Sequence, residues 1–97
     1  MFDDKAYYYI IAKHSNLYIT LNKADKHEGR GISQNVFQNA DIQKWKFKKS
    51  STGYYYIINK YSGLCLDVDN NSKDNGKHIN QRSLKHTDHQ RWKIEQL

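Results

Sequence analysis

Apolar and polar side chains alternate over several short stretches of this 97-residue chain. In its second half the alternating positions are Tyr55 and Ile57, Leu64 to Val68, Ile79 and Gln81, and Trp92 and Ile94. A period of two is typical of a β-strand that packs one face on a core. Gly, Asn, Asp and Ser cluster between the stretches and supply the turns that paired strands require. Since no stretch carries a capped helical stripe, the pattern predicts an all-β domain of short strands.

The pattern occurs twice along the chain. A shift of 47 positions places residues 7–49 on residues 54–96 without a gap, with identical residues at 16 of 43 pairs. About three identities would be expected by chance from such a composition. The paired stretches include YYYIIAKHSNL with YYYIINKYSGL, and DIQKWK with DHQRWK. We therefore predict a single domain, residues 1–97, built from two repeats, residues 1–49 and residues 50–97.

One carboxylate, that of Asp67, interrupts the apolar stretch LCLDV. Strands are depleted in Asp, so the residue indicates either a solvated face or a site. A period of two places Leu64 and Leu66 on the core face and directs Asp67 away from the core. Another interpretation stays open, in which Asp67 is a turn-supporting acceptor for the loop at Asn70 and Asn71.

Each repeat closes on a Gln-x-Trp motif, at Gln43 to Trp45 and at Gln90 to Trp92. The second repeat also carries SGLCLDV and a Gly shortly before the stretch INQ. Together these features resemble one lobe of the ricin B-type lectins, β-trefoils also known as family 13 carbohydrate-binding modules. The resemblance implies a fold of three lobes around a pseudo-threefold axis, with a six-stranded barrel capped by three hairpins. This chain contains two such lobes of about 47 residues each.

A barrel that lacks one third would leave strand edges and part of its core open to water. Two explanations stay open, namely missing sequence that supplies the third lobe, or assembly of several copies. Three two-lobed chains would hold enough lobes for two complete trefoils. We favour a homo-oligomer, because the chain begins with Met1 and ends directly after the second repeat.

The resemblance also implies a carbohydrate-binding site in the second repeat. Asp67 occupies the position of the family's sugar-binding Asp, whose carboxylate accepts hydrogen bonds from sugar hydroxyls. Its expected partners are Asn80, Arg82, His89 and Gln90. Galactose-like sugars are the family default. Arg82 stands where the family usually has an aromatic residue and His89 where it commonly has Asn, so acidic sugars also fit.

The first repeat lacks the polar groups of this implied site. Thr20 aligns with the carboxylate position and Ile42 with the imidazole position, so we predict a structural role for this repeat. Residues that both repeats share are expected to serve the fold. The two Trp residues should be buried in the core, and the two Gln residues should hold hairpin backbone, with that of the second repeat also reaching Asp67.

Composition adds limits to this picture. Hydrophobic residues make up 37% and aromatic residues 13% of the chain, which fits a small globular domain with an aromatic core. The net charge of +6 comes from dispersed Lys and Arg, so we do not predict nucleic-acid binding. A lone cysteine, Cys65, excludes an intrachain disulfide, and no apolar stretch is long enough to span a membrane. His86 and His89 have no third ligand nearby in sequence, so neither a metal nor a cofactor is predicted.

These features predict a non-catalytic lectin module that binds terminal sugars of cell-surface glycans or polysaccharides. No nucleophile paired with a base and no phosphate-binding glycine loop is recognisable, which argues against an enzyme. An alternative is a protein-interaction or subunit-joining module of a secreted toxin or enzyme complex. A further alternative is binding of anionic polymers through the positive charge. We expect the protein to be secreted or at the cell surface, although its first residues do not resemble a signal peptide.

Overall fold

The computed structural model describes residues 2–68 and 78–95. Within these ranges the chain is all-β, as predicted, and contains no α-helix. The strands are β1 (Tyr18–Leu21), β2 (Ile32–Asn35), β3 (Trp45–Ser51), β4 (Tyr54–Asn59), β5 (Cys65–Val68), β6 (Ile79–Arg82) and β7 (Trp92–Lys93). Two 3-10 turns, η1 (Asp41–Gln43) and η3 (Asp88–Gln90), each end two residues before a Trp.

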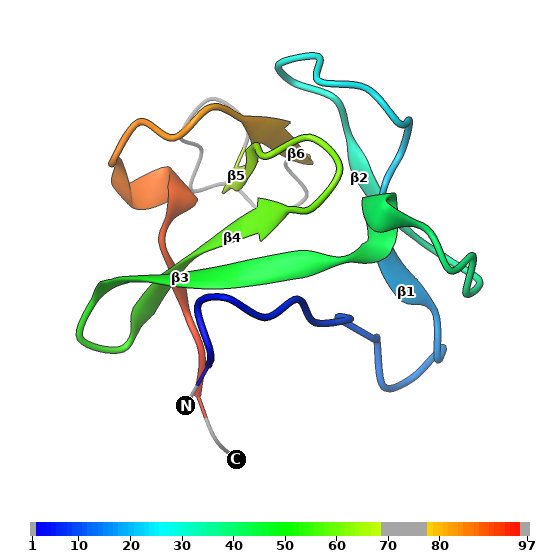
Figure 1. Cartoon of the computed structure of the whole chain (residues 1–97), viewed down its shortest axis with the longest axis horizontal. Helices are drawn as coiled ribbons and strands as arrows, with labels where there is room; N and C mark the ends of the chain where they lie inside the picture. Colours follow the sequence, from blue (N-terminus) through cyan, green and yellow to red (C-terminus); the bar gives the residue numbers. More distant parts are fainter. Residues whose placement is uncertain (1, 69–77, 96–97) are drawn as a thin grey trace.

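The β3–β4 hairpin joins the two repeats, which we name lobe 1 (residues 1–49) and lobe 2 (residues 50–97). Its strands pair antiparallel from Trp45 opposite Asn59 to Ser51 opposite Tyr54, with a bulge near Ser51. Gly53 makes the turn with a φ of 79°, a conformation that residues with a Cβ rarely adopt. In Figure 1 this hairpin lies below β5 and β6, and β1 and β2 lie on the right, near the start of β3.

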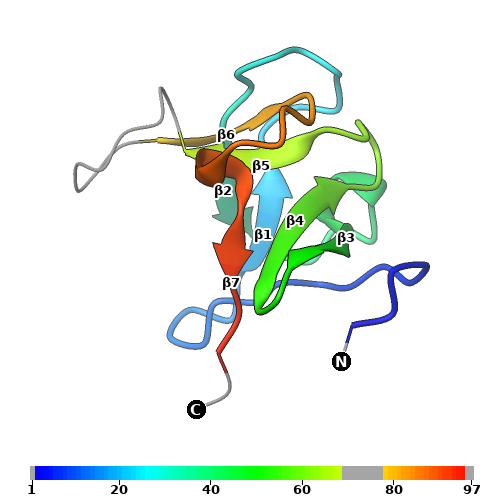
Figure 2. The ribbon, with the colours of Figure 1, turned by 90° about the vertical axis from the view of Figure 1, so that its left-hand side faces the viewer.

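The two lobes fold alike. In lobe 1, β1 pairs with β2 so that Thr20 lies opposite Ser33. In lobe 2, β5 pairs with β6 so that Asp67 lies opposite Asn80, at the same repeat positions. Strand β7 pairs with β4 and runs toward the same end of the molecule as the N-terminal segment (Figure 2). The sequence repeat is therefore a repeat of structure.

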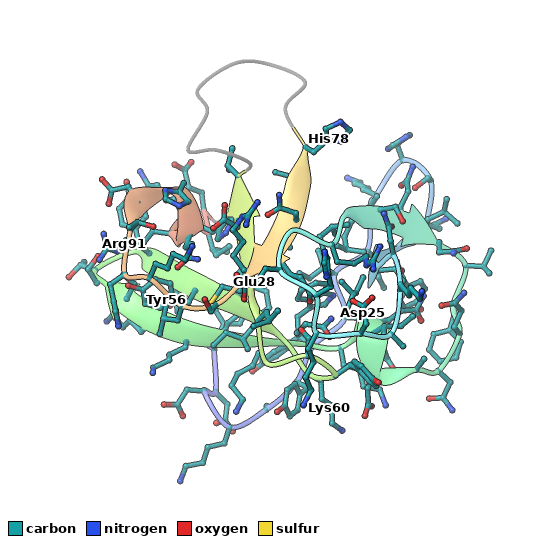
Figure 3. The ribbon with its side chains drawn as sticks, turned by 90° about the horizontal axis from the view of Figure 1, so that it is seen from above. Asp25, Glu28, Tyr56, Lys60, His78 and Arg91 are labelled. Carbon is teal, nitrogen blue, oxygen red and sulfur yellow. The ribbon has the colours of Figure 1, made fainter. Side chains whose placement is uncertain are left out.

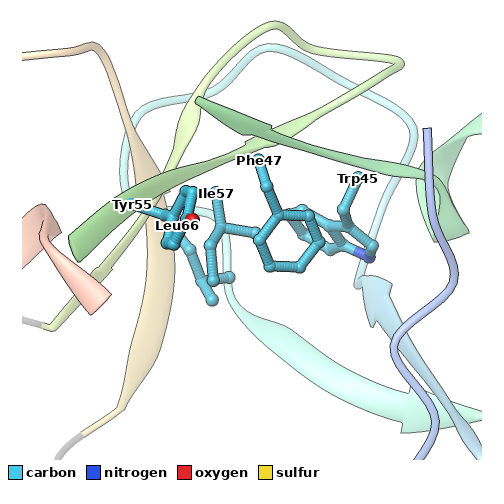
Figure 4. Packing of buried hydrophobic residues seen from close by; sticks show 5 residues of the cluster. All are labelled: Trp45, Phe47, Tyr55, Ile57 and Leu66. Atoms are coloured by element: carbon cyan, nitrogen blue, oxygen red, sulfur yellow. The ribbon is translucent and has the colours of Figure 1, made fainter. Parts of the chain in front are cut away.

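The core is a cluster of aromatic and aliphatic side chains along the β3–β4 hairpin. Figure 4 shows its buried members, which are Trp45, Phe47, Tyr55, Ile57 and Leu66. The Phe2 ring stacks on Phe47 with a centroid distance of 4.3 Å. The indole of Trp45 is fully buried and donates to the carbonyl of Ile19 at 3.0 Å, as expected of a core residue.

Trp92, the equivalent of Trp45, is only half-buried, although it packs against the same cluster. Its indole donates to the Leu66 carbonyl at 3.1 Å, which repeats the hydrogen bond of Trp45. The expectation of a buried indole is therefore met fully in lobe 1 and only in part in lobe 2. The apolar interior stays accessible on the side of Trp92.

Candidate functional site

Asp67 is buried, although its strand position directs it away from the apolar cluster. Only 1% of the residue is exposed. Its Oδ2 atom accepts a hydrogen bond from Gln90 Nε2 at 3.0 Å and lies 3.6 Å from His89 Nε2. Its Oδ1 atom is also buried and has no hydrogen-bond partner among the residues that the structure describes. The carboxylate thus keeps one acceptor open. The loop residues Asn70 and Asn71, which would make Asp67 a turn acceptor, lie outside the described residues.

Gln90 fixes this arrangement from the 3-10 turn η3. Besides Asp67, its Nε2 donates to the Ser83 carbonyl at 2.8 Å, and its Oε1 accepts from the Lys85 amide at 2.8 Å. All hydrogen-bonding groups of this fully buried amide are therefore used. Gln90 thus holds the backbone after β6 in place and reaches Asp67, as the sequence predicted. Its contact with a sugar stays a prediction.

His89 lies beside the carboxylate with 19% of its side chain exposed. Its Nε2 atom is 3.2 Å from Thr87 Oγ1, while Nδ1 is buried without a hydrogen-bond partner in the described part of the chain. Asn80 is buried at 4% exposure and faces Asp67 across the β5–β6 ladder. The structure therefore brings together Asp67, Asn80, His89 and Gln90.

Arg82, the fifth predicted residue, stands at the boundary between the lobes. It pairs with Cys65 across the ladder, and a Cβ placed on Gly29 of lobe 1 would lie 3.4 Å from its Nη2. Its guanidinium thus packs on lobe 1 backbone.

Burial, followed by the charge of the nearby Asp67, raises the pKa of the Cys65 thiol to about 11.

Lobe 1 repeats the scaffold without the open acceptor. Thr20 Oγ1 donates to the Tyr18 carbonyl at 2.7 Å and accepts from Gln43 Nε2 at 3.2 Å. Gln43 also donates to the Val36 carbonyl at 2.7 Å and accepts from the Gln38 amide at 2.8 Å. These are the contacts of Gln90 at the equivalent positions. Because Thr20 has a hydroxyl in place of a carboxylate, lobe 1 has no equivalent of the unbonded Oδ1 atom of Asp67.

The sequence reasoning missed the residues that join the lobes. Gln81 Nε2 donates to the carbonyls of Asp25 at 3.2 Å and His27 at 3.0 Å. The Glu28 carboxylate accepts from the Ser83 amide at 3.0 and 3.1 Å, and Figure 3 shows Glu28 between the two lobes. The sequence carried no clear signal for this contact, because Gln34, the repeat equivalent of Gln81, is exposed and accepts from Ser15 Oγ instead.

Over residues 2–68 and 78–95, no three His, Cys, Asp or Glu side chains gather in a way that would hold a metal ion. The same part of the chain has no helix long and apolar enough to cross a membrane.

The family model described as ricin-type beta-trefoil lectin domain-like matches residues 2–82 and, in a second match, residues 41–97. The chain belongs to this family. The predicted all-β fold of β-trefoil type is confirmed. No curated protein matches this ricin-type lectin domain.

Solved structures resemble the ricin-type lectin domain over nearly all of its length. The designed three-fold symmetric protein ThreeFoil is 31% identical with a TM-score of 0.91, over 94% of this chain and 65% of ThreeFoil. An exo-beta-1,3-galactanase from Clostridium thermocellum is 28% identical with a TM-score of 0.88, over 91% of this chain and 19% of that enzyme. A mosquitocidal holotoxin, 24% identical with a TM-score of 0.83 over 95% of this chain and 11% of the toxin, shares the fold. The domain thus spans about two thirds of a three-lobed protein and a small part of the larger ones.

Proposed function

We propose that this domain binds carbohydrate through lobe 2, with Asp67 as the principal acceptor. The observation that carries the proposal is the buried Oδ1 atom of Asp67, which lacks a hydrogen-bond partner among the described residues. A buried acceptor without a donor costs about 1–3 kcal/mol, and a ligand hydroxyl would recover that cost. Gln90 and His89 hold the carboxylate in position for such a donor.

The ligand class that we propose is a terminal galactose-like sugar. Neighbouring hydroxyls of a sugar would donate to Asp67 and accept from amides, and Asn80 offers such an amide in the same ladder. The similarity to a galactanase supports this choice. The imidazole of His89 and the guanidinium of Arg82 would favour acidic sugars among the possible ligands.

We also propose a non-catalytic role in a secreted protein or at a cell surface. The similarity to an exo-beta-1,3-galactanase supports this proposal. Single sites of this kind bind weakly, and association of several copies would raise the avidity without any new contact.

A glycan array tests the proposal with two matched variants. Asp67→Asn keeps the shape of the side chain and an oxygen for Gln90, and it replaces the open acceptor by a donor. We expect retention of galactose-like glycans to fall at least about tenfold, which corresponds to about 1.4 kcal/mol of binding free energy. Thr20→Val changes the equivalent buried position of lobe 1 and should leave retention unchanged. Equal retention by the Asp67 variant and the parent chain would refute the site.

The second candidate function is protein interaction. Exposed apolar side chains on lobe 1 favour it, with 60% of Val36 and 52% of Phe37 accessible. Parent protein that is folded but binds no glycan on the array would support this candidate over the first.

A further inference from the structure

Lysine side chains line the outer face of the β3–β4 hairpin, which is the face turned away from the core. In β3 the side chains of Trp45 and Phe47 enter the core cluster, so the lysines that alternate with them point to the other side. One more lysine, labelled in Figure 3, directly follows β4, and its backbone amide donates to the carbonyl of the first lysine at 2.8 Å. The four residues, which we name the lysine face, are Lys44, Lys46, Lys48 and Lys60.

Three ammonium groups of the lysine face are held by contacts within the chain. Lys46 Nζ and Lys60 Nζ each lie 5.1 Å from the centre of the Tyr7 ring, a distance at which a cation is attracted to an aromatic face. The Oδ1 atom of Asp41 lies 3.4 Å from Lys44 Nζ and 3.6 Å from Lys60 Nζ. Because Lys60 takes part in both sets of contacts, the three ammonium groups gather around Tyr7 and Asp41.

The positive charge of the lysine face is only partly neutralised. Asp41 is the one carboxylate that pairs with it within the described residues, and Lys46 and Lys48 form no ion pair there. Alternate residues of a strand are about 6.6 Å apart, so the lysines from Lys44 to Lys48 extend over about 13 Å. A single exposed ion pair contributes little, so a ligand must engage several of these groups at once. A polymer with regularly spaced negative groups meets this requirement.

The two tyrosine rings of this face are already covered, which favours a polysaccharide over a single-stranded nucleic acid. Proteins bind such nucleic acids largely by stacking the bases on aromatic rings. The Tyr7 ring is in contact with two ammonium groups. Tyr56, which pairs with Lys48 across the hairpin, is 4% exposed, and the Arg91 guanidinium lies 5.8 Å from its ring centre.

We infer that the lysine face binds an anionic polysaccharide, whose carboxylate or sulfate groups lie along β3 and pair with Lys44, Lys46 and Lys48. Charge complementarity carries this choice, since four ammonium groups stand against one carboxylate and three of them are held in place by the chain itself. The lysine face shares no residue with the candidate site around Asp67, and the inference does not rest on the proposed function.

Calorimetric titration of the purified 97-residue chain tests the inference with three polymers. Polygalacturonate supplies carboxylates, dextran sulfate supplies sulfates, and neutral dextran supplies neither. We expect binding to at least one of the charged polymers and none to neutral dextran. The affinity should fall as the salt concentration rises from about 50 to 200 mM, because the contacts are between exposed charges.

Two adjacent lysines give a matched pair of variants. Lys48 belongs to the lysine face, whereas Lys49 is equally exposed but lies with Phe47 and Tyr55 on the other side of the hairpin. We expect Lys48→Gln to weaken polymer binding about two- to fivefold, as loss of one exposed ion pair would. The double variant Lys46→Gln/Lys48→Gln should weaken it about tenfold, and Lys49→Gln should leave it unchanged.

Asp67→Asn should retain the binding of the charged polymers, which separates this inference from the proposed function. Equal losses in Lys48→Gln and Lys49→Gln would show attraction by net charge alone and would overturn the inference. Binding of neither charged polymer would overturn it as well. So would tighter binding of single-stranded poly(dT) than of either charged polysaccharide, because the occupant would then be a nucleic acid.

Discussion

At the scale of single residues, one substitution separates a structural lobe from a lobe with a candidate site. Gln43 and Gln90 make the same pair of backbone contacts, each holding the segment that leads into a 3-10 turn. Their third contact is a hydroxyl, Thr20, in lobe 1 and a carboxylate, Asp67, in lobe 2. The single oxygen of the hydroxyl already takes part in two hydrogen bonds, whereas the carboxylate has a second oxygen that no described residue contacts by a hydrogen bond.

The Gln43 side chain should be essential to stability. Gln43→Met keeps the volume but leaves the Val36 carbonyl and the Gln38 amide without their partner. We expect the free energy of unfolding to fall by about 1–3 kcal/mol, since two hydrogen bonds to the backbone are lost and each contributes about 0.5–1.5 kcal/mol. Urea denaturation followed by tryptophan fluorescence measures the change. Gln38→Met is the control, because Gln38 contributes its backbone amide and its side chain is exposed; an equal loss in both variants would contradict the assignment.

At the scale of elements, the loop of residues 22–31, which bonds to β6 and which we call the covering loop, is braced by contacts of its own. The Asp25 carboxylate accepts from Arg30 at 2.7 Å across the loop, and Gly29 adopts a φ of 85°. These features present the carbonyls of Asp25 and His27 in the direction of Gln81. Because these contacts lie within the loop, they would limit the conformational entropy that is lost when the lobes join.

Gly29→Ala should weaken this junction more than an ordinary glycine substitution. Both Gly29 and Gly53 have positive φ, and an Ala at either position costs about 1–2 kcal/mol in backbone strain. A backbone shift that relieved the strain at position 29 would disturb the 2.7 Å hydrogen bond from its amide to the Gln81 carbonyl, whereas a Cβ at position 53 would meet no atom within 4 Å. We therefore expect Gly29→Ala to lose more unfolding free energy than Gly53→Ala in the same urea titration. A loss at Gly53 that equals or exceeds the loss at Gly29 would show that the bond between Gly29 and Gln81 adds nothing to the cost of the substitution.

At the scale of the whole molecule, the charge on the covering loop links stability to pH. The hydrogen bond from Arg30, before any other cause, lowers the pKa of Asp25 below its ordinary 3.8. A carboxyl group whose pKa is lower in the folded state stabilises the fold above its unfolded pKa, and this stability is lost as the pH falls through the folded value. Protonation of Asp25 should therefore contribute to the loss of stability at acidic pH.

The variant Asp25→Asn tests this contribution. We expect a lower thermal midpoint than that of the parent chain near pH 7, and a difference that shrinks below about pH 4, where the parent carboxylate also takes up its proton. Calorimetry over pH 2 to 7 gives the two profiles. Profiles that stay parallel down to the lowest pH would show that the ion pair with Arg30 does not contribute.

Much of the fold was readable from the sequence, because a period of two and a 47-residue repeat depend on local and paired positions. The pattern also predicted the contact of Gln90 with Asp67. It did not predict that Asp67 is buried, since the cover comes from the 3-10 turn η3, which has no periodic signal. Nor did it predict the packing of Arg82 on Gly29, because that contact joins two lobes and depends on how they are arranged in space.

The spacing of the hydrogen bonds along the chain sets an order of folding. Within each lobe, the contacts of the closing Gln and Trp span only 23 and 26 residues. The bonds from the Gln81 side chain and the Ser83 amide to lobe 1 span 54 to 56 residues. Shorter loops close at a lower entropic cost, so each half of the molecule is expected to take shape by itself before the halves meet. In a duplicated chain of this kind, the contacts of large sequence separation are then needed only to join two halves that already have their shape.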